Sequence, residues 1–358
     1  MTNNQRRTAE SHAANSNIAG RATADGTSRF ADRHGSRFAP DYFRSFTANQ
    51  LRVSSIGLGT YLGDCNADDD RDYTEAAHHA LASGISLLDT AINYRCQRSE
   101  RAVGRALSRA VREGTVTRDE VVVCTKGGYI PLDNTAPETR EEYQAYVERE
   151  YFATGLARPE DVVAGGHCIA PTFLEAQIAR SRANLGIDTI DMYYVHNPEQ
   201  QLDAVTPAEL ATRLRSAFEM LEHQCDTGAI AAYGCATWNG LRAAPGTRGH
   251  LSLAELVSIA RDVCGDAHHF AAVQLPINLA FTEAVRVPTQ PLGAHTVPVL
   301  EAAGELGVAV VASASLLQGK LTQNLPATLH DALPGFSSDA QRAIAFVRSL
   351  PMVTTALV

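Results

Sequence analysis

Long apolar runs are absent from this chain of 358 residues, and so is any regular arrangement of cysteines. No stretch approaches the roughly 18 uninterrupted apolar residues of a membrane-spanning helix, and the N-terminus lacks the apolar core of a signal peptide. The seven cysteines are scattered and never spaced C-x-x-C, which is typical of reduced thiols and not of disulfides or zinc ligands. We therefore expect a cytoplasmic protein without a membrane partner and without a metal.

Positive charge is in deficit, because 31 Lys and Arg residues face 40 Asp and Glu residues. Nucleic acids and anionic membrane surfaces attract basic proteins, so this balance argues against both as main partners. It leaves small ligands open, since their sites are set locally. With 45% hydrophobic residues, the chain can bury a full core, and α/β barrels of about 250 residues form single domains.

The chain divides near residue 40 by composition. Residues 1–40 are rich in Thr, Ala, Asn, Ser, Gly and Arg and have no sustained hydrophobic period, which predicts a disordered leader. Residues 41–358 form the predicted folded unit. Just after the leader, the segment 44–54 is expected to form a small hairpin that covers one end of the fold.

From there, short apolar runs alternate with longer amphipathic stretches. Continuous apolar strands are typical of parallel sheets buried on both faces, and strand–helix alternation indicates βαβ units. Eight such strands predict an α/β fold of the (β/α)8 type, a TIM barrel. The predicted strands are 54–61, 86–92, 121–126, 189–196, 229–237, 270–276, 307–314 and 353–358, and the predicted helices are 72–83, 99–113, 172–185, 206–225, 251–264, 296–306 and 338–349.

Two features depart from a regular barrel. The connection after the third strand is far longer than an ordinary βα loop, and we treat residues 129–171 as an insertion at the catalytic rim. The sequence also ends at Val358, directly after the eighth strand, so a final helix is not expected. Because the insertion leaves from the rim, we expect residues 135–160 to build a lid or one wall of the substrate pocket.

Polar residues follow the second, third and fourth predicted strands, at the end where a parallel barrel gathers its working residues. They are Asp89 with Tyr94 in the next loop, then Lys126, then His196. A tyrosine has an ordinary pKa of about 10, and a neighbouring ammonium lowers it. A carboxylate keeps the lysine charged, and a neutral imidazole can orient a substrate oxygen. This set suits proton transfer to a carbonyl.

Each of these residues alone has a structural explanation. Asp89 could be a turn carboxylate, Tyr94 a half-buried aromatic residue, Lys126 a solvated lysine and His196 a strand-end residue. The glycine-rich segment GLGTYLG at 57–63 lacks G-x-G-x-x-G spacing, which argues against a Rossmann fold.

Several segments together resemble the aldo-keto reductase family. They are GLGTY (57–61), LLDTAINY (87–94), SERAVGRAL (99–107), VVVCTK (121–126), LGIDTIDMYYVHNPE (185–199) and VQLPIN (273–278). The resemblance covers about 43–358. It implies a catalytic set of Asp89, Tyr94, Lys126 and His196, with Tyr94 as proton donor, and NADP(H) as cofactor with NAD(H) as the alternative.

The resemblance also implies where the cofactor lies, across the mouth of the barrel. Its expected contacts are Gly59, Thr60, Asp89, Thr237, Gln274, Ser313, Leu316 and Gln318. The chain departs from the family at Thr237, where Ser-Asn is frequent, and at Ser313, where a tyrosine usually stacks on the nicotinamide. Basic residues that grip the adenosine phosphate after the last strand have no counterpart before Val358.

The expected activity is oxidoreduction of an aldehyde, ketone or sugar carbonyl, or of the corresponding alcohol. The substrate pocket is expected to include Tyr61, Tyr129, His167 and Trp238. The alternative is a barrel that binds a nucleotide or a protein without turnover. Neither the substrate nor the oligomeric state can be inferred from this sequence.

Overall fold

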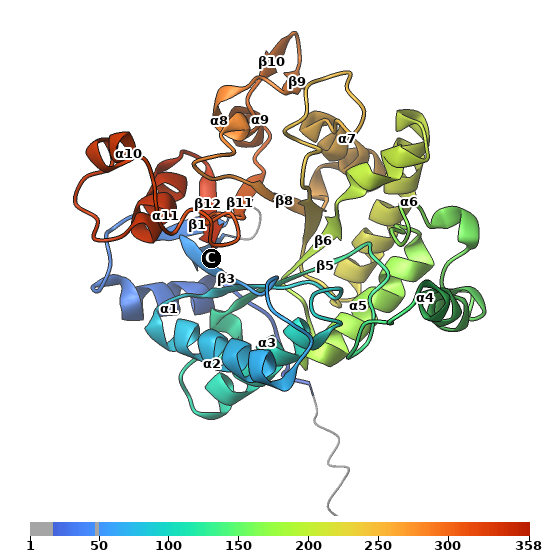
Figure 1. Cartoon of the computed structure of the whole chain (residues 1–358), viewed down its shortest axis with the longest axis horizontal. Helices are drawn as coiled ribbons and strands as arrows, with labels where there is room; N and C mark the ends of the chain where they lie inside the picture. The colour runs from blue at the N-terminus through green and yellow to red at the C-terminus, as the bar shows by residue number, and fades with distance from the viewer. Residues whose placement is uncertain (1–16, 47–49) are drawn as a thin grey trace, which may run out of the picture.

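The computed structural model describes residues 17–46 and 50–358 and has a closed parallel barrel at its centre. The strands follow the order β11-β12-β3-β4-β5-β6-β7-β8 around the barrel, with helices arranged outside them (Figure 1). The barrel closes where Ala356 of β12 pairs with Ile56 of β3. The barrel strands are β3 (Ile56–Gly59), β4 (Leu87–Asp89), β5 (Val122–Gly127), β6 (Met192–His196), β7 (Tyr233–Ala236), β8 (Phe270–Pro276), β11 (Ala309–Ser313) and β12 (Val353–Leu357).

The helices outside the barrel connect one strand to the next, as the βαβ pattern predicts. All eight predicted strands and all seven predicted helices are confirmed, although most strands are shorter than their apolar runs. Within the described ranges, no helix combines the length and apolar character needed to cross a membrane. The helices are α1 (Ala24–Gly35), α2 (Ala67–Ser83), α3 (Arg98–Arg112), α4 (Arg140–Val147), α5 (Pro171–Leu185), α6 (Pro207–Asp226), α7 (Leu253–Cys264), α8 (Glu283–Arg286), α9 (Val299–Glu305), α10 (Ala327–Ala332) and α11 (Asp339–Ser349).

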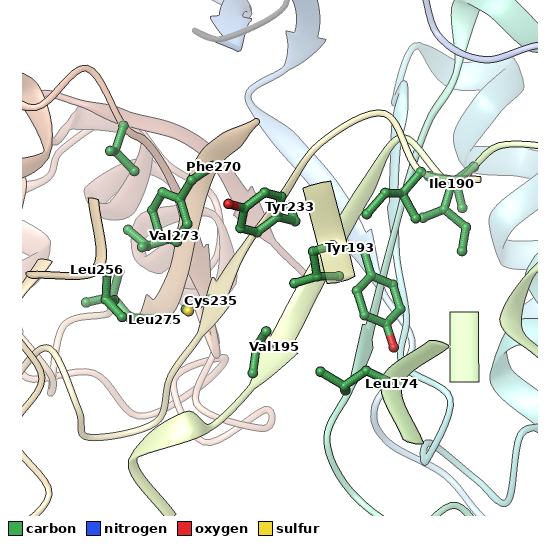
Figure 2. Close-up of a cluster of buried hydrophobic side chains, with 14 of the residues drawn as sticks. Leu174, Ile190, Tyr193, Val195, Tyr233, Cys235, Leu256, Phe270, Val273 and Leu275 are labelled. Atoms are coloured by element: carbon green, nitrogen blue, oxygen red, sulfur yellow. The ribbon is translucent and has the colours of Figure 1, made fainter. Parts of the chain in front are cut away.

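The barrel strands are buried on both faces, which explains their continuous apolar sequences. In β6, Met192 and Tyr194 belong to the cluster inside the barrel, whereas Tyr193 and Val195 belong to the larger cluster between strands and helices. Figure 2 shows part of this outer cluster, with Tyr193 and Val195 on β6 and further apolar residues on the neighbouring strands. This alternation leaves His196, the last residue of β6, on the inward side.

The predicted hairpin is confirmed and lies at the N-terminal end of the barrel. Strands β1 (Phe43–Phe46) and β2 (Leu51–Ser54) pair in antiparallel register. Phe46, Leu51 and Val53 join the same apolar cluster as the residues inside the barrel. The hairpin therefore closes the barrel floor and leaves the opposite end for a site. A second small hairpin, β9 (Gln290–Leu292) with β10 (His295–Val297), lies in the connection after β8.

The prediction of a disordered leader is wrong for residues 17–40, whereas residues 1–16 lie outside the described part. Helix α1 occupies residues 24–35, and Arg33 donates to both carboxylate oxygens of Glu120 at 2.7 and 2.8 Å. Most of α1 is polar, and its largest buried apolar residue is Phe30. Composition missed the helix because its contacts are ion pairs with residues about 90 positions away.

The insertion after β5 contains structure of its own. Helix α4 continues into a π-helical turn over Glu148–Phe152, and a short 3-10 turn follows at Pro159–Asp161. Val147, Tyr151 and Ala157 pack into the outer core with Phe173 of α5. In Figure 1, α4 lies at the periphery of the molecule, outside the ring of helices.

A buried ion pair ties the N-terminal segment to the barrel floor. Arg118 Nη2 lies 2.8 Å from Asp191 Oδ2, and both side chains are almost fully buried. The same carboxylate accepts hydrogen bonds from the backbone N–H groups of Ala22 and Val123. Removing it would leave a buried guanidinium without its counter-ion, although Arg118 also donates to the Val121 and Thr189 carbonyls, and would leave two backbone donors without their acceptor.

We therefore expect Asp191→Ala to lower the free energy of unfolding by about 3–5 kcal/mol, because it breaks a buried pair. Asp262→Ala is the matched control, since Asp262 also pairs with an arginine (Arg215, 2.9 Å) but on the exposed surface. Its effect should stay within about 0.5 kcal/mol. Chemical denaturation of both variants measures the difference, and equal effects would contradict the proposed role of Asp191.

Candidate functional site

A cavity of about 720 Å³ opens at the C-terminal ends of the barrel strands. Residues from the ends of β3, β4, β6, β7, β8 and β11, and from the loops that follow them, line it. The strand register brings distant residues to one level, because His196 pairs with Ala236 and Ala236 pairs with Gln274. This is the end of a parallel barrel where functional residues gather.

A buried ion pair lies at the base of the cavity, where Asp89 belongs to the lining and Lys126 is buried behind it. Lys126 Nζ lies 2.6 Å from Asp89 Oδ1 and donates a second hydrogen bond to the Thr90 carbonyl at 2.8 Å. Gln274 Nε2 donates to the other carboxylate oxygen at 2.8 Å. Burial acts to lower the pKa of Lys126, but Asp89 and the other acidic side chains around it together outweigh burial, and the pKa stands above its ordinary value. Lys126 is therefore charged at neutral pH.

Tyr94 lies directly beside this pair. The Lys126 ammonium is 5.0 Å from the centre of the Tyr94 ring. Burial raises the pKa of Tyr94 above its ordinary value of 10.0, and the charge of Lys126 opposes this rise only in part. Lys126 does lower this pKa, as expected, but the net direction is upward because burial has the larger effect, which sequence reasoning could not weigh. The Tyr94 side chain is a protonated phenol at neutral pH.

His196 completes the group. Its ring lies 5.9 Å from that of Tyr94 and 5.0 Å from that of Tyr129. Burial and the nearby Lys126 charge hold the pKa of His196 well below its ordinary value of 6.5. Nδ1 of this neutral imidazole has no hydrogen-bond partner among the residues that the structure describes. The structure thus brings together all four predicted catalytic residues.

The residues predicted to contact a cofactor also meet in this cavity. Thr237 Oγ1 is buried there and has no partner in the described part of the chain, so it can accept a hydrogen bond from a ligand or donate one to it. Gln274 commits its amide nitrogen to Asp89 and has its oxygen left for a ligand. These groups fit an amide-bearing ring such as nicotinamide. The predicted cofactor residues that line the cavity are Gly59, Thr60, Asp89, Thr237, Gln274, Ser313, Leu316 and Gln318.

Aromatic residues form the outer walls. Tyr61 and Trp238 are 57% and 43% exposed, so both stand at the entrance. Tyr129 is more enclosed, and its hydroxyl accepts a hydrogen bond from Asn197 Nδ2 at 2.8 Å. Asn93 and Asn197 also line the cavity, and sequence analysis missed both. Their positions directly beside Tyr94 and His196 were the signal that could have found them.

Two expectations about the insertion are wrong. His167 does not line the cavity, because its ring is fully buried behind Tyr129 and His196. Residues 135–160 form no wall of this cavity either; several of them line a separate hollow beside α5. The reason is that the helical part of the insertion packs against α5, on the outside of the barrel and away from the cavity. Tyr129, at the start of the insertion, is the part that reaches the site.

Two cysteines that are distant in sequence come into contact at the edge of the site. Cys65 Sγ and Cys96 Sγ are 3.1 Å apart, and they belong to the loops that carry Tyr61 and Tyr94. Burial raises the pKa of the Cys96 thiol to about 12. In the ranges 17–46 and 50–358, no group of three His, Cys, Asp or Glu residues is arranged to hold a metal ion.

Sequence comparison identifies the family. The profile of the Aldo/keto reductase family matches residues 55–331. The chain belongs to the aldo/keto reductase family. A D-threo-aldose 1-dehydrogenase from Pseudomonas sp. is 33% identical over 184 residues. The aligned segment is 51% of this chain and spans 48% of that relative, or about half its length.

Solved structures share the barrel of this aldo/keto reductase. An aldo-keto reductase from Bacillus halodurans in its holo form has a TM-score of 0.57 at 18% identity, covering 88% of this chain and 86% of that one. A glycerol dehydrogenase from Gluconobacter oxydans has a TM-score of 0.57 at 20% identity, covering 89% and 86%. An aldo/keto reductase from Klebsiella pneumoniae in complex with NADP and acetate has a TM-score of 0.56 at 19% identity, covering 88% and 83%.

A buried glutamate holds the loop that carries Trp238. Glu199 Oε1 accepts hydrogen bonds from the backbone N–H groups of Trp238, Asn239 and Gly240 at 2.7, 3.0 and 3.1 Å. Burial raises the pKa of this carboxyl above its ordinary value. Sequence analysis gave Glu199 no role, because its three partners lie about 40 residues further along the chain. The position of Trp238 at the entrance depends on this contact.

We expect Glu199→Ala to loosen this loop in the aldo/keto reductase, because three backbone donors lose their acceptor. Trp238 is the single tryptophan of the chain, so intrinsic fluorescence reports on this loop alone. Acrylamide quenching should increase by about twofold or more, since a buried donor without a partner costs about 1–3 kcal/mol. Glu199→Gln, which keeps an acceptor oxygen, should change less. Unchanged quenching in Glu199→Ala would refute this role.

Proposed function

We propose that this protein is an NADP(H)-dependent oxidoreductase that reduces an aldehyde, ketone or sugar carbonyl, or oxidises the corresponding alcohol. The observation that carries the proposal is the convergence of Asp89, Tyr94 and His196 on one cavity, with Lys126 buried directly beside Asp89 and Tyr94. They come from β4, the loop after it, β5 and β6. A barrel that only binds a ligand has no need for a proton donor set on a buried ion pair.

The chemistry assigns a task to each group. When bound, the nicotinamide cofactor supplies or accepts the hydride. The Tyr94 phenol donates a proton to the carbonyl oxygen during reduction. Lys126 lies beside the phenol and stabilises the phenolate that remains, while Asp89 holds the ammonium at 2.6 Å. The neutral His196 imidazole orients the carbonyl oxygen from the other side.

The cofactor assignment rests on the fit of the cavity and on relatives. The unpartnered Thr237 hydroxyl and the Gln274 side chain suit a carboxamide. NADP accompanies the Klebsiella pneumoniae structure, and NAD(H) remains the alternative. The similarity to a D-threo-aldose 1-dehydrogenase favours sugars among the substrates. Seven free cysteines support a cytoplasmic location.

Cofactor binding is the first test. NADPH should bind with a dissociation constant of about micromolar or tighter, measured by titration calorimetry, and should quench Trp238 emission because Trp238 lines the cavity. NADH in the same experiment decides between the two cofactors. Binding of neither cofactor, together with no turnover on a panel of aldehydes, ketones and aldoses, would refute the oxidoreductase proposal. Nucleotide binding without turnover would support a non-catalytic barrel instead.

Tyr94→Phe tests the proton donor. Loss of the Tyr94 hydroxyl should lower kcat for carbonyl reduction by about 10²–10⁴-fold, the usual contribution of general acid catalysis. The dissociation constant for NADPH should stay unchanged. Tyr143→Phe is the matched control, because that hydroxyl lies in the insertion and donates to the Gly165 carbonyl. A loss of similar size in the control would show that the effect is not specific to Tyr94.

The raised pKa of Tyr94 sets the pH dependence. Reduction needs the protonated phenol, which is present below its pKa and lost only as the pH rises through a value above 10.0. Reduction should therefore vary little between about pH 6 and pH 9, whereas alcohol oxidation, which needs the phenolate, should rise with pH. Profiles of kcat/KM in both directions check this. A reduction rate that falls steeply near pH 8 would contradict it.

A further inference from the structure

The insertion after β5 reaches the site from behind, at a point where its two ends meet. Tyr129 and His167 form an isolated antiparallel bridge. The N–H of Ile130 donates to the Gly166 carbonyl, and the N–H of Cys168 donates to the Gly128 carbonyl, each at 2.7 Å. Backbone hydrogen bonds therefore fasten the end of the insertion to its start.

His167 meets the backbone of His196 at this point. Its Nε2 lies 2.7 Å from the His196 carbonyl oxygen, and its Nδ1 lies 2.8 Å from Gln201 Nε2. The carbonyl and the ring face different neighbours, so this contact leaves the His196 imidazole free for the cavity.

The partners of His167 determine its tautomer. Arg213 Nη1 donates to Gln201 Oε1 at 2.7 Å, and because a guanidinium can only donate, this contact fixes which end of the Gln201 amide is the oxygen. Gln201 Nε2 must then donate to Nδ1 of His167. Nε2 of the neutral His167 ring therefore carries the proton and donates to His196. Burial lowers the pKa of His167 to about 4, so this arrangement persists at neutral pH.

The peptide that follows His196 is thus held from two sides. The N–H of Asn197 donates to the Ala236 carbonyl of β7 at 2.6 Å, and the carbonyl of His196 accepts from His167. Both contacts act on the peptide group between His196 and Asn197, where the chain leaves β6. The chain turns there, because Asn197 has a left-handed backbone with φ of 48°. Without them, the direction of the His196 ring would depend on a strand end alone.

The backbone at Gly128 leaves room for this contact. A side-chain Cβ at Gly128, where φ is +141°, would stand 3.0 Å from the His196 carbonyl oxygen and 3.3 Å from His167 Nε2. His167 also packs edge-on against Tyr129, whose ring packs in the same way against His196. One buried imidazole therefore contacts both residues that form this side of the cavity.

We propose that His167 is a positioning residue, which fixes the orientation of His196 and Tyr129 for the reaction. This inference rests on the proposed oxidoreductase function. It also gives the insertion a role other than a lid, because the insertion supplies a hydrogen-bond donor to the backbone of the histidine that orients the carbonyl.

The first test compares two substitutions at His167. His167→Phe keeps a ring beside Tyr129 but removes both hydrogen bonds, and kcat/KM for the carbonyl should fall by about tenfold or more. His167→Gln places an amide nitrogen at the same number of bonds from the backbone and should restore most of the activity. The dissociation constant for NADPH should change little in either variant. His34→Phe, at a buried histidine near the barrel floor, controls for a general loss of stability.

The outcomes separate the two proposals. Inactive wild-type protein on every carbonyl refutes the oxidoreductase function itself. Active wild-type protein with a folded His167→Phe variant that keeps wild-type kcat/KM refutes the positioning role alone. Equal losses in His167→Phe and His167→Gln, or an equal loss in His34→Phe, also refute it.

Two further measurements apply if His167→Phe does not fold. The ¹⁵N chemical shifts of wild-type His167 should show a neutral ring protonated at Nε2, and a ring protonated at Nδ1 would refute the proposal. Gly128→Ala should lower kcat/KM, whereas Gly155→Ala should not. Gly155 also has a positive φ, of +73°, but a Cβ there meets no atom within 4 Å among the described residues. Equal kcat/KM values in these two glycine variants would refute the proposal as well.

Discussion

Lys126 and Asp89 are buried together at the mouth of the barrel, where neither side chain reaches solvent to a useful extent. Taking two charges out of water costs several kcal/mol for each ion unless nearby groups compensate. Here the Thr90 carbonyl and Gln274 supply the compensation, so strands β4, β5 and β8 are all tied to the pair. Lys126 is one of only two lysines in the chain. Tyr94 lies beside this ammonium, and the same charge contributes to the lowered pKa of His196.

A second layer of buried polar groups holds the loops around the pair. Glu199 accepts three N–H groups from the loop that carries Trp238, and His167 holds the carbonyl of His196. Both supply hydrogen bonds to backbone groups that have just left a strand. Such groups are costly to bury unpaired. The contacts of Glu199 and His167 therefore stabilise the fold and also fix the backbone of Trp238 and His196, which line the cavity.

Much of the fold was predictable because its elements follow local patterns. Eight apolar runs became the eight barrel strands, and the segment 44–54 became the floor hairpin. Helix α1 was missed because it binds through ion pairs to Asp119 and Glu120, which hydrophobic periodicity does not record. The prediction that residues 135–160 form a lid was wrong, because their apolar side chains pack against α5 outside the barrel. An insertion that begins at the rim of a barrel can therefore still fold away from the cavity.

The sequence by itself determined the barrel and the residue types that meet at its rim, since Asp89, Tyr94, Lys126 and His196 each stand at or just after a strand end. Parallel strands bring such residues to one rim whatever the details of packing. The tertiary structure decided how these groups behave. Burial in the folded chain raises the pKa of Tyr94. His167 lies behind the cavity and not in its lining, and Cys65 is in contact with Cys96. Desolvation and hydrogen bonds between distant segments are properties of packed side chains, and no local pattern in the sequence encodes them.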